Sequence, residues 1–145
     1  MSIQEYIAKA GTAWFLGFFP LAEIYVAVPA AIASGLDNVS VLVWTISGNF
    51  MPALLIIGLY DWLRGFERVD RWFDRMNSER LSDWLNRYGL WIVLIITPWI
   101  GIWATTVTAR VFGMNTRLFL PAAFTSITLY ATAILVSIRT GADLI

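Results

Sequence analysis

Residues 11–36 read GTAWFLGFFPLAEIYVAVPAAIASGL. The stretch is long and apolar enough for a helix that crosses a bilayer, which needs about 20 such residues. Two prolines, Pro20 and Pro29, interrupt it, and its only charged residue is Glu23. Proline removes a backbone donor, and a broken helix is tolerated at membrane depth only where protein or water covers the freed carbonyls. The stretch therefore predicts a re-entrant helical hairpin rather than one straight crossing.

Three further apolar stretches cover residues 38–60, 88–109 and 118–138, and none of them contains a charge. Pro98 and Gly101 interrupt the middle one, which predicts a second hairpin, whereas the other two predict true crossings. The 145-residue chain is 59% hydrophobic and 14% charged, whereas a soluble domain is roughly a quarter charged. A chain this short cannot bury so much apolar surface within itself. The predicted fold class is therefore an all-α membrane protein.

The composition excludes several classes of function. Ten basic residues balance ten acidic ones, so no net field attracts nucleic acid. The chain has no cysteine and no histidine, which removes disulfides, thiol chemistry and the commonest metal ligand. We therefore expect no metal site, no cofactor and no enzymatic activity.

The two halves of the chain share a frame of glycine and proline. Gly11, Pro20 and Gly35 each have the same residue type 78 positions later. Apolar helices match by chance at many places, but an ungapped match of these residue types predicts an ancestral duplication. The predicted boundaries are 11–60 for repeat one, 61–87 for a linker and 88–138 for repeat two, within a single membrane domain of residues 1–145.

If each half consists of one hairpin and one crossing helix, the two halves are inverted relative to each other. Inverted repeats with broken helices recur in transporters, and the glycines and prolines at the breaks would be structural hinges. The alternative is four ordinary spanning helices in parallel halves. The predicted hinges are Pro20, Pro29, Gly35, Pro98, Gly101 and Gly113.

The linker, residues 61–87, contains six of the ten basic residues. Its apolar residues recur at spacings of three and four, which predicts one or two amphipathic helices in the membrane interface. A plain connector with a solvated charged face is the alternative. The arginines place the linker on the cytoplasmic side. The predicted apolar face consists of Trp62, Phe66, Val69, Trp72, Phe73 and Met76, and Asn77 or Ser78 would cap a second short helix with Leu81, Trp84 and Leu85.

Two charged residues could carry chemistry within the membrane. Glu23 lies near the middle of its apolar stretch, and a carboxylate at that depth is a functional hypothesis by default. A neutral, hydrogen-bonded glutamate is the structural alternative. Arg110 follows the third stretch and could either pair with Glu23 between inverted hairpins or extend to the interface.

Uncharged polar and aromatic residues extend the candidate site for substrate or ions. Asn49 lies between Gly48 and Pro52, and a buried amide requires partners. Trp103 follows Pro98 and could meet a cation with its ring face. Threonine hydroxyls could bind carbonyls freed by the breaks. The predicted substrate- or ion-binding residues are Glu23, Arg110, Asn49, Trp103 and Thr105.

Several short motifs occur in a specific order along nearly the whole chain. They are Phe19-Pro20-Leu21-Ala22-Glu23, Val28-Pro29-Ala30, Gly48-Asn49-x-x-Pro52, Tyr88-Gly89-Leu90 and Pro98-x-x-Gly101. With these motifs the chain resembles the small multi-drug export protein family, and it looks like a distant relative of the DedA/VTT membrane proteins. The resemblance implies paired re-entrant hairpins and a functional acid at Glu23. The family pattern has Gly and Arg directly after this acid, where this chain has Ile24 and Tyr25, so a nearby positive charge would come from Arg110.

These features favour a small membrane transporter that exports small or cationic molecules, with proton or ion coupling through Glu23. Two alternatives stay open: a lipid scramblase of the DedA/VTT kind, and a structural or assembly subunit that transports nothing. The expected partners are membrane lipid and an unidentified small-molecule or ion cargo, with a homo-oligomer as a candidate assembly and no nucleic acid. The expected location is the cytoplasmic membrane of a prokaryote.

Overall fold

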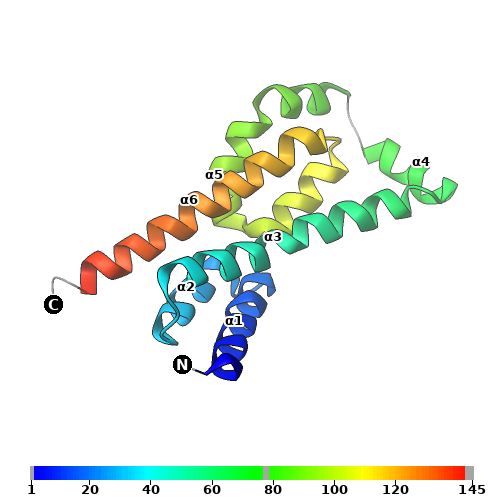
Figure 1. Ribbon diagram of the computed structural model, residues 1–145. Helices are drawn as coiled ribbons and strands as arrows, with labels where there is room; N and C mark the ends of the chain where they lie inside the picture. The colour runs from blue at the N-terminus through cyan, green and yellow to red at the C-terminus, as the bar shows by residue number, and fades with distance from the viewer. Residues whose placement is uncertain (1, 77–78, 143–145) are drawn as a thin grey trace. The chain divides into compact units, whose positions relative to one another are not determined.

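A computed structural model describes residues 2–76 and 79–142, and every regular element within these ranges is an α-helix (Figure 1). The predicted all-α fold class is therefore confirmed. The six helices of the described ranges are α1 (Ile3–Phe18), α2 (Glu23–Ala33), α3 (Asn38–Leu63), α4 (Glu67–Met76), α5 (Glu79–Val111) and α6 (Thr116–Ala142).

Three of these helices are long and apolar enough to cross a membrane: α3, most of α5 (Ser82–Val111) and most of α6 (Thr116–Gly141). Only 33% of the apolar window of α3, and 39% of each of the other two, is buried within the chain. The remaining apolar surface requires a nonaqueous environment, which hydrocarbon provides. The chain is therefore a membrane protein. The first apolar stretch is not among these helices, because it is divided between α1 and α2.

The helices form two compact units. Unit one consists of α1, α2, α3 up to Met51, and α6 from Ile127 onward. Unit two consists of α3 from Pro52, α4, α5, and α6 up to Ser126. The helices α3 and α6 thus contribute to both units, whereas α5 belongs to unit two alone.

Unit one begins with two antiparallel helices, α1 and α2 (Figure 1). Phe19 ends α1 in an extended conformation, with ψ at 127°, as steric clash with the following ring favours for the residue before Pro20. Glu23 begins α2, which runs back along α1, since Ala8 near the start of α1 and Ser34 just after α2 line the same small pocket. The chain therefore reverses direction at the interruption that the proline predicts.

In unit two, α5 doubles back on itself at Gly101, whose φ of 81° and ψ of 160° are not helical (Figure 1). The start of α5 lies beside the residues that follow its end. The Ser82 hydroxyl donates to the Gly113 carbonyl at 3.2 Å, and the Asn115 N–H donates to Asn86 Oδ1 at 2.8 Å. A straight helix of 33 residues would be about 50 Å long and would hold these groups far apart.

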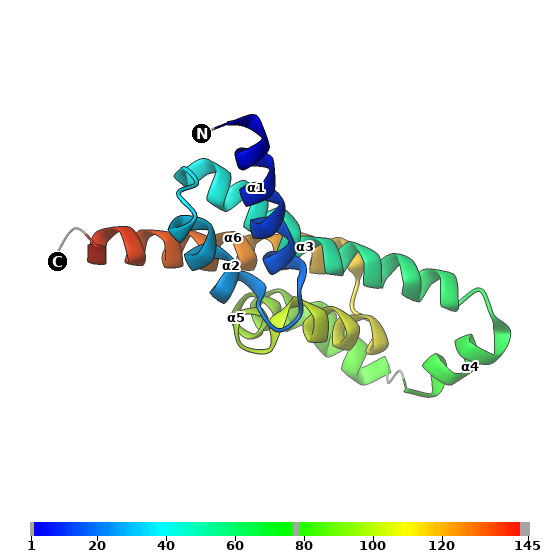
Figure 2. The same ribbon diagram turned by 90° about the horizontal axis from the view of Figure 1, so that it is seen from below.

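The linker contains one separate helix, α4, between the end of α3 and the start of α5 (Figure 2). The predicted second short helix is not a separate element, because α5 begins at Glu79 and continues through Arg87 into the apolar stretch. Gly89 interrupts it only weakly, since glycine within a helix costs about 1 kcal/mol. Trp62 and Phe66 of the predicted apolar face are exposed. The predicted caps Asn77 and Ser78, and the side chains of Val69, Trp72, Phe73, Met76 and Leu81, lie outside the described part of the chain.

The turns that lead into α3 and α6 are built alike. Each contains a glycine in the left-handed region, Gly35 with φ 84° and Gly113 with φ 74°, which glycine adopts without a Cβ clash. In each turn the next N–H donates to a carbonyl five residues back, the bond that defines a Schellman helix end. These bonds join Leu36 to Ala31 at 3.3 Å and Met114 to Ala109 at 2.8 Å.

A polar cluster holds the N-terminus of α3 against α1. The Asp37 carboxylate accepts the Ser40 N–H at 3.0 Å and the Ser40 hydroxyl at 2.6 Å, and the Tyr6 hydroxyl lies 3.0 Å from Ser40 Oγ. The Ser40 hydroxyl, followed by its N–H, lowers the pKa of Asp37. Because the pKa is lowered on folding, this contribution to stability is present at neutral pH and is lost as the pH falls through the lowered pKa.

Candidate functional site

The break between α1 and α2 gives Glu23 an unusual backbone conformation. Its φ is 47°, and no other non-glycine residue in the described ranges has a positive φ. Left-handed backbone costs a residue with a Cβ atom roughly 1–2 kcal/mol. Glu23 is half-buried and is the first residue of α2, where unbonded N–H groups and the helix dipole favour a carboxylate. The carboxyl group predicted from the sequence thus lies at the break itself.

Close contact between backbones joins α1 to α3 in unit one. Gly17 and Gly48 are both buried. A Cβ atom built on Gly17 would lie 2.6 Å from the Thr45 carbonyl oxygen, and one built on Gly48 would lie 2.1 Å from the Trp14 carbonyl oxygen. Only glycine permits this approach, which is a common way for membrane helices to pack.

At this contact, the Asn49 side chain donates a hydrogen bond to a carbonyl in the last turn of α1. Its side chain is 2% exposed, and Nδ2 donates to the Gly17 carbonyl at 2.9 Å. Gly17 lies in the last turn of α1, where carbonyls have no partner within the helix. The buried amide therefore has a structural partner at the break. Its predicted part in cargo binding stays a prediction.

Near the break in α5, a backbone carbonyl likewise accepts a hydrogen bond from a side chain of another helix. Pro98 has no N–H to donate to the Leu94 carbonyl one turn earlier. The Ser126 hydroxyl on α6 donates to this carbonyl instead, at 3.0 Å. Both units thus use a polar side chain of a crossing helix to bind a carbonyl near a break, as membrane proteins require.

Other predicted site residues lie just after the break in α5. Thr105 is 6% exposed, and its hydroxyl donates to the Gly101 carbonyl at 2.7 Å. Thr106 makes the same bond to Ile102 at 2.6 Å. Trp103 precedes both threonines and is half-buried. The threonine hydroxyls therefore have local partners that support the second arm of α5.

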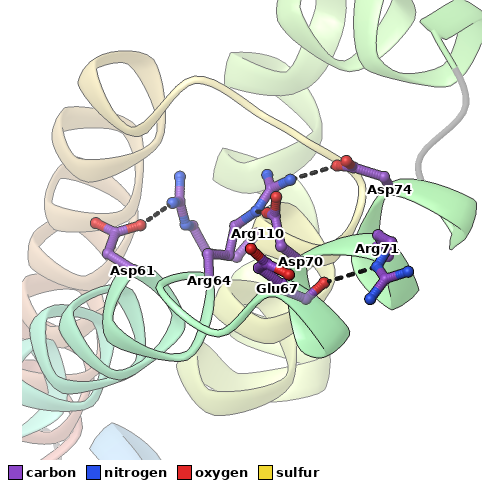
Figure 3. A network of polar contacts seen from close by, with 7 residues as sticks. All are labelled: Asp61, Arg64, Glu67, Asp70, Arg71, Asp74 and Arg110. Atoms are coloured by element: carbon purple, nitrogen blue, oxygen red, sulfur yellow. Dashed lines mark hydrogen bonds and ion pairs between the residues drawn. The ribbon is translucent and has the colours of Figure 1, made fainter.

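Arg110 lies in the last turn of α5 and belongs to a polar cluster of unit two (Figure 3). One terminal nitrogen binds the Asp61 carboxylate, and the other donates to Thr116 Oγ1 at 2.6 Å. The guanidinium lies 4.6 Å from the centre of the Tyr60 ring, within the range of a cation–π interaction. Asp61 thus binds the arginine for which the sequence suggested Glu23. The pairing with Glu23 stays a prediction.

Arg64 extends the cluster to α4 (Figure 3). Its Nε donates to Asp70 at 2.5 Å, and a terminal nitrogen binds Asp74. The Asp70 hydrogen bond is the largest cause of the raised pKa of Arg64. These bonds fix α4 beside the end of α3.

A family model described as "Putative small multi-drug export protein" matches residues 23–134 of the chain. The chain belongs to this family. The match begins at Glu23 and covers α2, α3, α4, α5 and most of α6. The predicted resemblance to the small multi-drug export family is therefore confirmed, whereas the likeness to DedA/VTT proteins stays a prediction. Comparison with curated proteins and with solved structures gave no match.

Four of the six predicted hinges lie where the described helices break or turn, but the prediction that Pro29 interrupts the chain is wrong, because α2 continues through it. Pro20 is in the connection between α1 and α2, and Pro29 is inside α2. Gly101 marks the break of α5, with Pro98 three residues before it. Gly35 and Gly113 form the turns described above. Movement at any of these residues stays a prediction.

Sequence reasoning missed several partners of these residues. Gly17 and Gly48 are spaced like other small residues in the chain, and only the helix packing distinguishes them. The sequence placed Asp61 in the linker. In the structure it lies in the last turn of α3 and binds Arg110, which is 49 residues away. Ser126 could not be distinguished by sequence from the other hydroxyl residues of the apolar stretches. The available signal was the presence of small and polar residues within the apolar stretches, where such residues often mediate helix packing.

Proposed function

We propose that this chain is a small exporter of the cytoplasmic membrane in which two inverted repeats surround a site formed by Glu23. Each repeat consists of a re-entrant hairpin followed by one crossing helix. The cargo is a small or cationic molecule that leaves in exchange for a proton or another ion. Membership of the small multi-drug export family supports export, and α3 and α6 have the length that two crossings require.

Backbone geometry supports the repeat. Within residues 2–76 and 79–142, the residues with positive φ form two pairs, Glu23 with Gly101 and Gly35 with Gly113, and the members of each pair are 78 positions apart. The same offset separates the start of α3 at residue 38 from the start of α6 at residue 116. It also relates the glycine and proline frame of the two halves. Conformational breaks at one constant offset are expected from a duplicated hairpin and crossing helix.

Helix length supports re-entrance. α1 has 16 residues and α2 has 11, so they are about 24 Å and 16 Å long. Both are shorter than the hydrocarbon core, which is about 30 Å thick. Because α1 and α2 are antiparallel, a pair of this length enters and leaves at one face. One crossing per half then inverts the second half relative to the first.

One observation carries the role of Glu23. Repeat two has Gly101 at the break, and glycine is the residue that a positive φ favours. Repeat one has a glutamate at the equivalent position, in spite of the less favourable backbone. Residues held in such conformations cluster at functional sites. Glycine would suffice at a break with only a structural role. We therefore attribute the glutamate at this position to a function of its carboxyl group.

The chemistry of Glu23 follows from this position. The N-terminus of α2 favours the carboxylate, whereas the apolar stretch around it favours the neutral acid. A carboxyl group between these two influences can release a proton and bind a cation in its place. Proton uptake from the outer face and cation release to it would then give export by exchange.

Reconstitution of the wild-type protein in liposomes tests this function. We expect a fluorescent organic cation, ethidium, to move when a proton gradient is imposed and to stop when an ionophore collapses the gradient. Protein-free liposomes are the control. Ethidium movement that is unaffected by the gradient would contradict proton exchange. Scrambling of a fluorescent phospholipid without any movement of ethidium would replace export with lipid handling.

A further inference from the structure

A polar pocket of about 540 Å³ lies in unit two, and three arginines line it: Arg64, Arg110 and Arg117. Asn86 and Thr116 also line the pocket. Thr116 is the first residue of α6, whose N-terminal dipole adds positive potential. The arginines and the helix end together form a site for an anion.

Arg110 has an unused donor at this pocket. Its two terminal nitrogens bind Asp61 and Thr116, but its Nε is buried and has no acceptor among the described residues. A buried donor without an acceptor is unfavourable. The site therefore lacks at least one acceptor oxygen that a ligand could supply after a small rearrangement of the guanidinium.

Arg117 adds a further positive charge to the lining of the pocket. Its side chain is exposed, and no ion pair is found for it in the ranges that the structure describes. Three carboxylates of the polar cluster bind other arginines: Asp61 binds Arg110, and both Asp70 and Asp74 bind Arg64. A positive charge is thus available at the mouth of the pocket.

The turn itself does not require these arginines. At the 78-residue offset of the proposed repeat, Arg110 corresponds to Ile32 and Arg117 corresponds to Val39. Both turns have a Schellman helix end and a positive-φ glycine, yet only the one in unit two has arginines at these two positions. Charge at this turn is therefore a specialisation of repeat two, and this step alone rests on the proposed repeat.

Aromatic residues place the pocket at the level of lipid head groups. Trp62 is 62% exposed and lies between the pocket residues Tyr60 and Arg64 along the chain, while Tyr88 is 43% exposed and follows Asn86 in α5. Exposed tryptophan and tyrosine concentrate at the membrane interface. A pocket beside them is within reach of a lipid phosphate.

We propose that this pocket binds the phosphate group of an anionic phospholipid. Arg117 attracts the head group, and Arg110 and Arg64 hold the phosphate oxygens, because guanidinium groups bind phosphate with paired hydrogen bonds. The cytoplasmic leaflet is rich in anionic lipid, which agrees with the predicted side of the linker. This site is separate from Glu23 and stands whether or not the protein exports cations.

Binding of short-chain lipids to the protein in dodecyl maltoside tests the site. We expect dioctanoyl phosphatidylglycerol to bind saturably by calorimetry and to raise the unfolding temperature, and dioctanoyl phosphatidylcholine to bind more weakly. Arg117→Gln should weaken phosphatidylglycerol binding about fivefold, the effect of one arginine near an anionic lipid surface. Arg117→Lys should keep most of the affinity.

Arg139→Gln is the matched control, because it removes the same charge from an exposed position in unit one, where Arg139 binds Asn38. We expect its lipid affinity to equal that of the wild type. Equal affinities for both lipids, or unchanged binding by a folded Arg117→Gln variant, would overturn the site. Inorganic phosphate that binds as tightly as phosphatidylglycerol would overturn the assignment to lipid and identify a soluble phosphate as the ligand.

Discussion

Replacing Gly48 with alanine is expected to destabilise the protein by at least about 3 kcal/mol, the upper end of the range for overpacking a core. The added methyl group would lie 2.1 Å from the carbonyl oxygen, 2.9 Å from the carbonyl carbon and 3.0 Å from the Cα atom of Trp14. All three are backbone atoms, so no side-chain rotation relieves the clash. α1 would have to move away from α3, and the Asn49 hydrogen bond to Gly17 would be lost with it. Chemical unfolding in detergent, followed by circular dichroism, measures the change.

Gly58→Ala is the control for this substitution. Gly58 lies in the same helix, α3, and a Cβ atom there meets nothing within 4 Å. Alanine is the better helix former by roughly 0.5–1 kcal/mol, so this variant should be as stable as the wild type or slightly more stable. If Gly48→Ala unfolds at the same denaturant concentration as Gly58→Ala, the close packing of α1 on α3 is wrong.

Replacing Glu23 with glutamine is expected to reduce proton-driven efflux to the level of empty liposomes. Glutamine keeps the size and hydrogen-bonding capacity of the side chain but cannot release a proton or carry charge. Glu23→Asp retains the carboxyl group and should retain part of the flux. The assay is the ethidium flux described above, on protein shown to be folded. Full flux in a folded Glu23→Gln variant would exclude Glu23 as the exchange site.

The stability of Glu23 variants tests, independently of transport, whether glutamate is conformationally unfavourable at this position. Glu23→Gly and Glu23→Gln both lack the charge, but only glycine relieves the backbone at φ 47°. The glycine variant should therefore be more stable than the glutamine variant by about 1 kcal/mol, while both fail to transport. A glycine variant that is less stable than the glutamine variant would contradict the conformational argument.

Local signals predicted the interruptions of the fold. Pro20 forces the residue before it to be extended, and Gly101 and Gly113 permit backbone that other residues resist, so each break could be located from the sequence. The left-handed conformation of Glu23 could not, because glutamate has no preference for a positive φ. The structure shows this conformation, and Gly101, 78 residues later, has a positive φ as well.

Long-range partners were beyond the sequence. Asn49 binds a carbonyl 32 residues away, and Arg110 binds a carboxylate 49 residues away. Spacing within one helix says nothing about such contacts, since they depend on how the helices pack. The amphipathic pattern of the linker had a similar limit, because it predicted helices there but could not show that the second continues into α5.

In the proposed inverted repeat, the two hairpins enter the membrane from opposite faces. The chain has no cysteine, so single cysteines at Val39 and Arg117 provide clean probes. These exposed residues follow the turns at Gly35 and Gly113 and are equivalent at the 78-residue offset. The measurement is their reaction with a membrane-impermeant maleimide in intact cells and again after permeabilisation. We expect Val39→Cys to react in intact cells and Arg117→Cys to react only after permeabilisation. Reaction of both cysteines from the same face would contradict this expectation and favour four spanning helices in parallel halves.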